Sequence, residues 1–400
     1  MYAPASKGKK PRVVLGLNAG TSADGVDLAI VRFGAGKTAR PVFIDGRERK
    51  YPGDIKALLD TVSNAPHVKI EQLIHLDQAL GLFYGRAAAS FIRTMKQKKI
   101  VVDAVASHGQ TVRHSPARVR IGDFRVGGSL QLGSLEQIAV ATGKPVVGDF
   151  RQADIALGNE GAPITVAAME QLLADPKESR LVVNIGGIAN YFYFPSRRVR
   201  RPIQAADCGP GNSLSDLLAT DLFGRPYDRN GKLARSGEVS HRLLALLSAH
   251  PFFHNRTVST GREEFGRELV DSILQFGRKF GLPPESLIAT ASELTVRGVV
   301  AAVTPLMKRD QGLDKLYLTG GGENNKFFKT RLTELLPGLK VNSVRQLGIP
   351  PGLTEAAAYA VMGRATLDGQ PMRTVFCGGK TQKSIPVLGK ITLPPVKAGV

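Results

Sequence analysis

Residues 13–31 read VVLGLNAGTSADGVDLAIV, two apolar runs separated by a short polar segment rich in glycine. The runs at 13–17 and 26–31 each have the length and apolar character of a buried strand. Glycine permits the tight reversal that joins two antiparallel strands. The stretch therefore predicts a β-hairpin whose turn, Gly20-Thr21-Ser22-Ala23-Asp24-Gly25, is a candidate phosphate-binding loop.

A second hairpin of the same kind opens the other half of the chain, with strand-like runs at Leu181–Ile185 and Ala189–Phe194 joined by Gly186-Gly187. Further strand-like runs lie at 100–106 and 316–318, and helical spacing is found at about 67–99, 213–222, 266–280, 284–307, 325–336 and 354–366. Strands that alternate with long helices indicate an α/β protein, and the repeated hairpin indicates two related domains. We place the domains at 1–148, rejoined by the tail 378–400, and at 149–377.

Composition narrows the class of protein. Of 400 residues, 42% are apolar and 22% charged, as in ordinary soluble domains. No unbroken apolar run approaches the ~18 residues of a membrane helix, and the N-terminal residues lack the pattern of a signal peptide. We therefore expect a cytoplasmic protein without a membrane partner. The two cysteines, Cys208 and Cys377, are too few for a disulfide framework or a cysteine-based zinc site.

The formal net charge is +20, which raises the question of an anionic partner. The basic residues are scattered, no zinc finger, RNP-type aromatic motif or basic zipper is present, and there is no tryptophan to stack on bases. We expect a solvated basic surface and no nucleic acid, although a functional anionic partner beyond the cofactor stays open. A homodimer is compatible with the sequence.

Three glycine-rich segments could bring backbone N–H donors to a phosphate: 20–25, Gly186-Gly187 and Gly320-Gly321-Gly322. None is a Walker loop or a dinucleotide fingerprint, and each alone is equally a structural turn. Their order, a hairpin opening each half and a later strand–glycine–helix, predicts a clamp that binds ATP from two domains. Asp24 and Asp27 flank the first turn. We assign Mg²⁺ to Asp24, while Asp27 either helps to bind the cofactor or pairs structurally.

Asp207 lies at the end of a strand-like run, before the turn Cys208-Gly209-Pro210-Gly211-Asn212 and a helix. Phosphoryl transfer needs a base that positions and deprotonates the attacking group, and Asp207 suits that role. The alternative is an aspartate that orders the turn. Cys208 is expected to be a buried small residue, because no histidine in the motif could activate it.

Eight blocks of sequence resemble the anhydro-N-acetylmuramic acid kinases and their fungal relatives, the levoglucosan kinases. They are GLNAGTSADGVD (16–27), SHGQT (107–111), DFR (149–151) with Asp154 and GAP (161–163), NIGGIAN (184–190), DCGPGN (207–212), STGRE (259–263) with Phe265, GGG (320–322) with Asn324, and EA (355–356). The similarity runs from about residue 14 to about residue 395, nearly the whole chain. So many blocks in the same order make the resemblance specific.

The resemblance implies an actin-like ATPase fold (the sugar kinase/Hsp70/actin class), with two domains around a central cleft. It implies that water opens the 1,6-anhydro bridge of the sugar and that O6 takes the γ-phosphate of ATP. In anhydro-N-acetylmuramic acid this gives N-acetylmuramic acid 6-phosphate, a step of cell-wall sugar recycling. The aspartate that matches Asp207 activates the water. The residues implied to bind the cofactor, besides the first loop and Asp27, are Asn184, Gly186, Gly187, Gly209, Gly211, Asn212, Gly320, Gly321, Gly322 and Asn324.

Glu355 is the second catalytic carboxylate that the resemblance implies, although a glutamate at a helix N-terminus is also favoured by the helix dipole. On the sugar side the resemblance points to His108, Gln110, Arg151, Glu160, Gly161, Ala162 and Pro163. His108 could instead be a buried histidine with satisfied nitrogens, and Arg151 could serve a structural ion pair.

Two positions depart from the family pattern. Ala23 stands where the family usually has a large apolar residue, and Glu160 stands where it usually has Gln. A carboxylate at 160 would repel the lactyl carboxylate of a muramic sugar unless an arginine offsets it. Anhydro-N-acetylmuramic acid is the expected substrate, with the neutral sugar levoglucosan as the alternative. A non-catalytic actin-like module that binds ATP is the second alternative, and the joint presence of Asp24, Asp207 and Glu355 argues against it.

Overall fold

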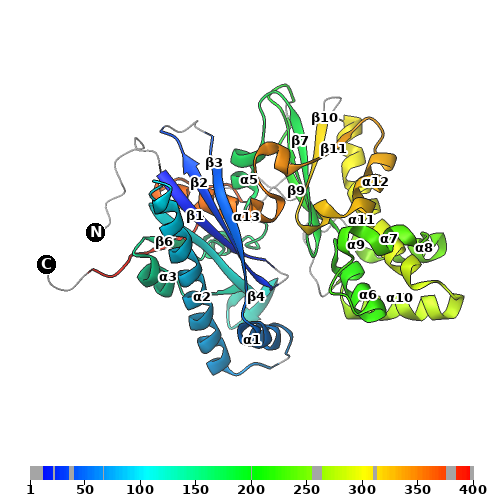
Figure 1. Ribbon diagram of the computed structural model, residues 1–400, viewed down its shortest axis with the longest axis horizontal. Coiled ribbons are helices and arrows are strands. Elements are labelled where there is room, and N and C mark those ends of the chain that lie inside the picture. The colour runs from blue at the N-terminus through cyan, green and yellow to red at the C-terminus, as the bar shows by residue number, and fades with distance from the viewer. Residues whose placement is uncertain are drawn as a thin grey trace. The chain divides into compact units, whose positions relative to one another are not determined.

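A computed structural model describes residues 12–20, 23–35, 40–65, 67–199, 201–254, 264–309, 313–374 and 384–396. Thr21, Ser22 and the block 259–263 lie outside these ranges. Contacts divide the chain into two compact units (Figure 1). Unit 1 comprises Met1–Leu172, Leu353–Val375 and Thr381–Val400, and unit 2 comprises Leu173–Gly352 and Phe376–Lys380. The domain bounds given above stay a prediction.

Unit 1 is built on a seven-stranded sheet with the order β12-β6-β4-β1-β2-β3, with β5 paired to β4. Its strands are β1 (Arg12–Ala19), β2 (Gly25–Phe33), β3 (Val42–Lys50), β4 (Ala104–Ile121), β5 (Phe124–Leu132), β6 (Val146–Gly148) and β12 (Lys390–Thr392). β1, β2 and β3 form an antiparallel meander, and β4 and β6 continue parallel to β1. Val14 and Leu15 of β1 have no exposed surface, as the apolar run at 13–17 predicts.

The helices of unit 1 are α1 (Gly53–Asn64), α2 (Ile70–Gln97), α3 (Leu135–Thr142), α4 (Gln152–Ala156) and α13 (Thr354–Leu367), with α5 (Val166–Leu173) at the boundary with unit 2. α2 buries Leu76, Leu80, Tyr84, Ala88 and Phe91, whose spacing places them on one face against the sheet. α13 packs on β1, β2 and β4 and is buried on nearly all sides. Such a helix needs small residues, and TEAAAYAVMGRATL supplies them.

Unit 2 repeats the arrangement with a five-stranded sheet of order β11-β10-β7-β8-β9. Its strands are β7 (Ser179–Ile185), β8 (Ala189–Phe194), β9 (Gln204–Gly209), β10 (Leu313–Thr319) and β11 (Lys340–Ser343). β7, β8 and β9 form an antiparallel meander, and β10 and β11 run parallel to β7. Both sheets therefore place the first strand of the meander next to the parallel strands. The predicted α/β class and the repeated hairpin are confirmed.

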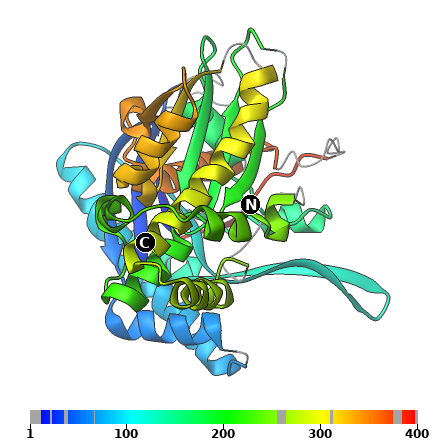
Figure 2. The ribbon, with the colours of Figure 1, turned by 90° about the vertical axis from the view of Figure 1, so that its right-hand side faces the viewer.

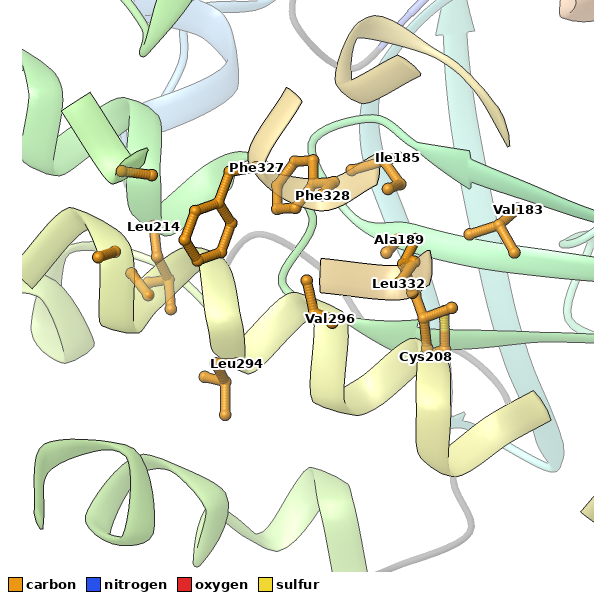
Figure 3. Close-up of a cluster of buried hydrophobic side chains, with 14 of the residues drawn as sticks. Val183, Ile185, Ala189, Cys208, Leu214, Leu294, Val296, Phe327, Phe328 and Leu332 are labelled. Atoms are coloured by element: carbon orange, nitrogen blue, oxygen red, sulfur yellow. The ribbon is translucent and has the colours of Figure 1, made fainter. Parts of the chain in front are cut away.

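The helices of unit 2 are η1 (Arg229–Gly231), η2 (Gly321–Asn324), η3 (Val344–Leu347), η4 (Pro351–Leu353, at the boundary), α6 (Ser213–Phe223), α7 (Lys232–Ser236), α8 (His241–Ser248), α9 (Pro251–His254), α10 (Arg267–Phe280), α11 (Pro284–Arg309) and α12 (Lys326–Leu335). Figure 3 shows how α11 and α12 cover the sheet, with Val296 and Phe328 pointing to side chains of the strands. Within the described residues, the part of α11 from Pro284 to Met307 is the one helix long and apolar enough to cross a membrane, and 72% of its apolar window is buried in the protein.

The strand predicted at 100–106 was wrong in its bounds. β4 begins at Ala104 and continues to Ile121, where it turns back into β5. The two strands form a long hairpin that projects from the sheet, seen as a teal arm in Figure 2. The residues of this arm are mostly exposed, so its sequence lacks the apolar run by which the other strands were recognised.

Candidate active site

The hairpin predicted from residues 13–31 is formed by β1 and β2, with Asn18 opposite Asp27. At its turn, the N–H of Ala23 donates to the carbonyl of Gly20 at 3.1 Å, and Ala23 has φ of 53°. A side chain in this left-handed region is strained, so the turn holds Ala23 in a conformation that glycine would adopt more easily. Gly25 is required, because an added Cβ would lie 2.3 Å from the carbonyl oxygen of Arg49.

The carbonyl of Gly20 is also bound from the neighbouring strand. Nε2 of Gln110 in β4 donates to this carbonyl at 3.2 Å. Oε1 of Gln110 accepts from the hydroxyl of Tyr51 at 3.0 Å, and Tyr51 is 2.6 Å from the hydroxyl of Tyr84. Gln110 is 1% exposed, so its amide serves the first loop in this structure. The observed contacts of Gln110 are to the loop, and its place on the sugar side stays a prediction.

Glu355 lies in the first turn of α13, where β1 positions it. Nδ2 of Asn18 donates to Oε2 of Glu355 at 2.8 Å. The helix can come this close because Gly16 of β1 has no side chain, and an added Cβ would lie 1.9 Å from the carbonyl oxygen of Ala356. Burial raises the pKa of Glu355, whereas the bond from Asn18 and the charge of Arg151 lower it.

Asp24 and Asp27 flank the turn in different environments. Asp24 is exposed, whereas Asp27 is half-buried. The pKa of Asp27 is raised to about 8, mostly by burial and also by the negative charges of Glu48, Glu355 and Asp24. Among the residues that the structure describes, no group of three histidine, cysteine or acidic side chains could hold a metal by itself. The exposed carboxylate of Asp24 fits Mg²⁺ nonetheless, because this ion usually takes one or two carboxylates together with water and phosphate oxygens.

His108 and Arg151 form the centre of the predicted sugar side. Nε and one terminal nitrogen of Arg151 lie 3.2 and 3.1 Å from Nε2 of His108. The imidazole stacks on Tyr359 with ring centres 4.6 Å apart. Burial lowers the pKa of His108 well below its ordinary value, and the charge of Arg151 adds to the effect. His108 is therefore a neutral acceptor that orients the guanidinium of Arg151.

The segment 159–163 is fixed from within unit 1. Arg151 donates to the carbonyl of Gly161 at 3.1 Å. The buried carboxylate of Asp154 accepts from the N–H of Gly161 at 2.9 Å and from Asn159 at 2.8 Å. Thr374 donates to the same carboxylate. The Ala162–Pro163 peptide is cis, and Glu160 is exposed.

In unit 2, the turn between β7 and β8 is joined to the turn after β9. The N–H of Asn212 donates to the carbonyl of Gly186 at 2.8 Å, and its Nδ2 donates to Ile185 at 3.1 Å. The hydroxyl of Ser213 donates to Gly187 at 2.5 Å. The Gly186-Gly187 turn and the motif at 207–212 are thus one structure.

Gly211 is the tightest point of that structure. It has φ of 59°, and an added Cβ would lie 2.5 Å from the carbonyl oxygen of Gly186. Its own carbonyl accepts from Thr295 of α11 at 2.7 Å. Gly209, by contrast, has ordinary contact distances around an added Cβ, the nearest being 3.6 Å to Thr295. Of these two glycines, only Gly211 is required by the backbone.

The Gly320–Gly322 segment joins the same group of turns. Gly320 has φ of 76°, and an added Cβ would lie 2.3 Å from Oδ1 of Asn184. A Cβ on Gly322 would lie 2.4 Å from the side chain of Ile185. Gly321 and Asn324 are exposed. The Gly186-Gly187 turn, the 207–212 motif and the Gly320–Gly322 segment are therefore brought together at the ends of β7 and β10.

Asp207 is placed by β9 beside this group. It pairs with Asn190 of β8 in the strand register, and its side chain is half-buried. Cys208 points the other way, into the core of unit 2, where burial raises the pKa of its thiol well above the usual value. An added Cβ on Gly298 would lie 1.9 Å from the carbonyl of Cys208, so α11 packs directly on this strand end. The expectation that Cys208 is a buried small residue is confirmed.

Several residues that shape the two halves of the candidate site were not predicted. Asn18 lies inside the quoted hairpin, but as a strand residue it carried no chemical signal. Tyr51, Tyr84 and Tyr359 act through contacts with residues distant in the chain, which no local pattern reveals. Only Asn18 could have been noticed from the sequence, because a polar residue next to a buried apolar run needs a hydrogen-bond partner.

Comparison with known proteins identifies the family. The profile of the family "AnmK: Anhydro-N-acetylmuramic acid kinase" matches residues 12–394. An anhydro-N-acetylmuramic acid kinase of Salinibacter ruber is 34% identical over 388 residues, 96% of this chain and 96% of that protein. The protein of the same name from Shewanella pealeana is 34% identical over 93% of this chain and 96% of its own length.

A solved structure, the activator of 2-hydroxyisocaproyl-CoA dehydratase from Clostridium difficile, aligns over 89% of this chain and 96% of its own with 12% identity and a TM-score of 0.40. Such a distant likeness says nothing about activity. The family match confirms the predicted family and, with it, an ATP-dependent sugar kinase. The chain belongs to the anhydro-N-acetylmuramic acid kinase family.

Proposed function

We propose that this protein is an ATP-dependent kinase that opens the 1,6-anhydro ring of anhydro-N-acetylmuramic acid and phosphorylates O6, giving N-acetylmuramic acid 6-phosphate. The observation that carries the proposal is the family match over residues 12–394, with relatives of that name covered almost end to end. No observation favours levoglucosan as the substrate or a non-catalytic module.

Asp207 is the base in this proposal. It takes a proton from the water that attacks C1 of the sugar, and the bond between C1 and O6 breaks. O6 keeps the electron pair of that bond and attacks the γ-phosphorus of ATP, from which ADP leaves. The position of Asp207 supports the role, because the end of β9 places a half-buried carboxylate beside the turns proposed to bind phosphate.

The turns supply the backbone donors for ATP. We assign the phosphates to the first loop of unit 1 and to the Gly186-Gly187 turn with Asn212, and the nucleoside to Gly320–Gly322 with Asn324. The connections among the unit 2 turns support this assignment, because rigidly held donors stabilise developing charge without reorganising. Asp24 would hold Mg²⁺, which supplies positive charge to the phosphates when it is bound.

The sugar is assigned to His108, Arg151 and the segment 160–163, with Glu355 as the second catalytic carboxylate. The contacts of Arg151 support this part of the proposal. Its guanidinium is held by His108 and Gly161, which places a fixed positive charge next to the residue that follows Glu160 in the chain. In this proposal the guanidinium of Arg151 attracts a substrate carboxylate and so counters its repulsion by Glu160.

The reaction is tested with purified protein, ATP and Mg²⁺, with anhydro-N-acetylmuramic acid or levoglucosan in separate reactions, in water enriched in ¹⁸O. We expect ADP, a sugar 6-phosphate, and ¹⁸O at C1 but not in the phosphate. Faster turnover of levoglucosan would contradict the assignment of anhydro-N-acetylmuramic acid as the substrate. ¹⁸O in the phosphate would contradict the attack of water at C1. Absence of turnover with both sugars would contradict the proposal that the protein is an anhydro-sugar kinase. A cytoplasmic location and a homodimer stay predictions.

A further inference from the structure

Asn18 is a polar side chain that follows the apolar run 13–17 of β1, and it is 4% exposed. Val14, four residues earlier and on the same side of β1, is 0% exposed, so this face of the strand is buried and suits an apolar residue. A buried amide without a partner is costly. The partner of Nδ2 is Oε2 of Glu355, 2.8 Å away and 337 residues distant in the chain.

The backbone fixes the geometry of this pair. Gly16, two residues before Asn18 and on the same side of β1, lets the start of α13 lie against the strand. Asn18 is therefore held by the sheet and Glu355 by a helix that cannot move closer or rotate freely. A hydrogen bond between such rigid elements selects one orientation of the carboxylate.

We propose that Asn18 is a positioning residue that orients the carboxylate of Glu355 for the anhydro-sugar kinase reaction, an inference that rests on the function proposed above. Asn18 acts through Glu355 and needs no contact with substrate. A purely structural role would be met by filling the buried space, for which the amide group is not needed.

The charged and titratable groups around Glu355 define what the amide does. Asp27 of β2 carries a carboxylate whose pKa the charge of Glu355 raises. Tyr359 lies one turn further along α13 and stacks on His108 of β4. Arg151, after β6, supplies the positive charge that, like the Asn18 bond, lowers the pKa of Glu355. Loss of the amide removes one of the two influences that lower this pKa, so burial favours the protonated form of Glu355 more strongly.

The test replaces Asn18 by leucine, which has nearly the same shape and no donor. The rate of the reaction between ATP and anhydro-N-acetylmuramic acid is measured between about pH 5 and about pH 9. We expect kcat to fall at least about tenfold at low pH, the acid limb of the pH profile to move to higher pH, and KM for ATP to stay within about twofold. The Glu355→Gln variant should lose little further activity when Asn18→Leu is added, because the two act as a unit. Unchanged profiles, or losses that add, would overturn the proposal.

Two controls separate orientation from folding. Asn342→Leu makes the same change in β11, where the amide donates only to backbone carbonyls of Leu316 and Lys340, and it should leave the pH profile unchanged. Asn18→Asp keeps the shape but replaces the donor by a second carboxylate. It should move the acid limb further than leucine does. A smaller shift with Asn18→Asp would count against the proposal.

A readout without substrate keeps this inference distinct from the proposed function. The titration of the Glu355 carboxyl can be followed by ¹³C NMR in labelled protein, with the signal assigned through Glu355→Gln. We expect the midpoint to rise in Asn18→Leu. If the midpoint shifts but the protein has no kinase activity, the proposed function is wrong, while the effect of Asn18 on the Glu355 carboxylate is supported. An unshifted midpoint in an active kinase would sink the role of Asn18.

Discussion

A Cβ added to Gly16 would lie 1.9 Å from the carbonyl oxygen of Ala356 and 2.8 Å from the backbone nitrogen of Ala360. The strand that opens the chain and the helix that carries Glu355 are therefore in backbone contact. Both neighbours are main-chain atoms of one helix, so no side chain can rotate away to make room. Any side chain at position 16 must displace α13.

Gly16→Ala should destabilise the protein and impair turnover together. Overpacking of this kind costs about 1–3 kcal/mol, measured as the free energy of unfolding in denaturant. Because the displaced helix carries Glu355, kcat should fall more than KM for ATP rises. Gly53→Ala is the matched control, since nothing lies within 4 Å of its added Cβ and alanine is the better helix former. Equal stability of the two variants would contradict the close contact.

Asp207→Asn should remove turnover and leave ATP binding intact. Loss of a general base lowers kcat by about 10²–10⁴. ATP affinity, measured by calorimetry, should change little, since the donors proposed for ATP are backbone groups of other residues. Asp221→Asn, which breaks a surface ion pair with Arg267 in the same unit, is the control and should retain activity. An active Asp207→Asn variant would show that another group is the base.

Gln110→Leu should weaken ATP binding through the first loop. The substitution removes the donor to the carbonyl of Gly20 and the acceptor for Tyr51. We expect KM for ATP to rise several-fold, in line with about 1 kcal/mol for a lost hydrogen bond. Gln131→Leu is the control, because its amide donates to Thr111 and Ser129 within the hairpin of β4 and β5 and not to the first loop. If KM for the sugar rose instead, Gln110 would belong to the sugar side, as the sequence predicts.

Asp27→Asn should stabilise the protein more at pH 8 than at pH 4. The folded pKa of Asp27 is about 8, above its ordinary value of 3.8. Between these values the folded chain holds a proton that the unfolded chain releases, so stability falls as the pH rises. The asparagine variant lacks this loss, and its gain in melting temperature should grow with pH. Asp123→Asn, on a side chain that is 98% exposed, should show no such trend. An equal gain at both pH values would mean that Asp27 is ionised throughout.

Much of the framework could be predicted from local patterns. The apolar runs at 181–185 and 189–194 are β7 and β8, and the helix expected at 354–366 is found at Thr354–Leu367. These elements are buried, and burial imposes the periodicity by which they were recognised. β4 was misjudged because its outer part, from Arg113 onward, is largely exposed and follows no apolar rule.

The partners of the site residues could not be predicted in the same way. Glu355 was predicted because the sequence resembles a kinase family. Its hydrogen bond from Asn18 could not be predicted, because it depends on how β1 and α13 pack. The amide of Gln110 faces the first loop because Tyr51 and Gly20 lie on either side of it, and these residues are 59 and 90 positions away. Tertiary packing decides such contacts, and neighbouring residues in the chain carry no trace of them.

The discontinuity of unit 1 has a consequence for how the protein is made. α13 and β12 complete its core and its sheet edge, yet they follow the 180 residues of Leu173–Gly352. At about 5–20 residues per second, a ribosome would need about 10–40 s to reach α13 after it finishes the first segment. During that interval the faces of β1 and β4 that pack against α13 are not yet covered by it. Nearly all of the chain of unit 2 has already been made. Synthesis therefore favours unit 2 as the first part to fold, and the N-terminal half as the substrate for chaperones.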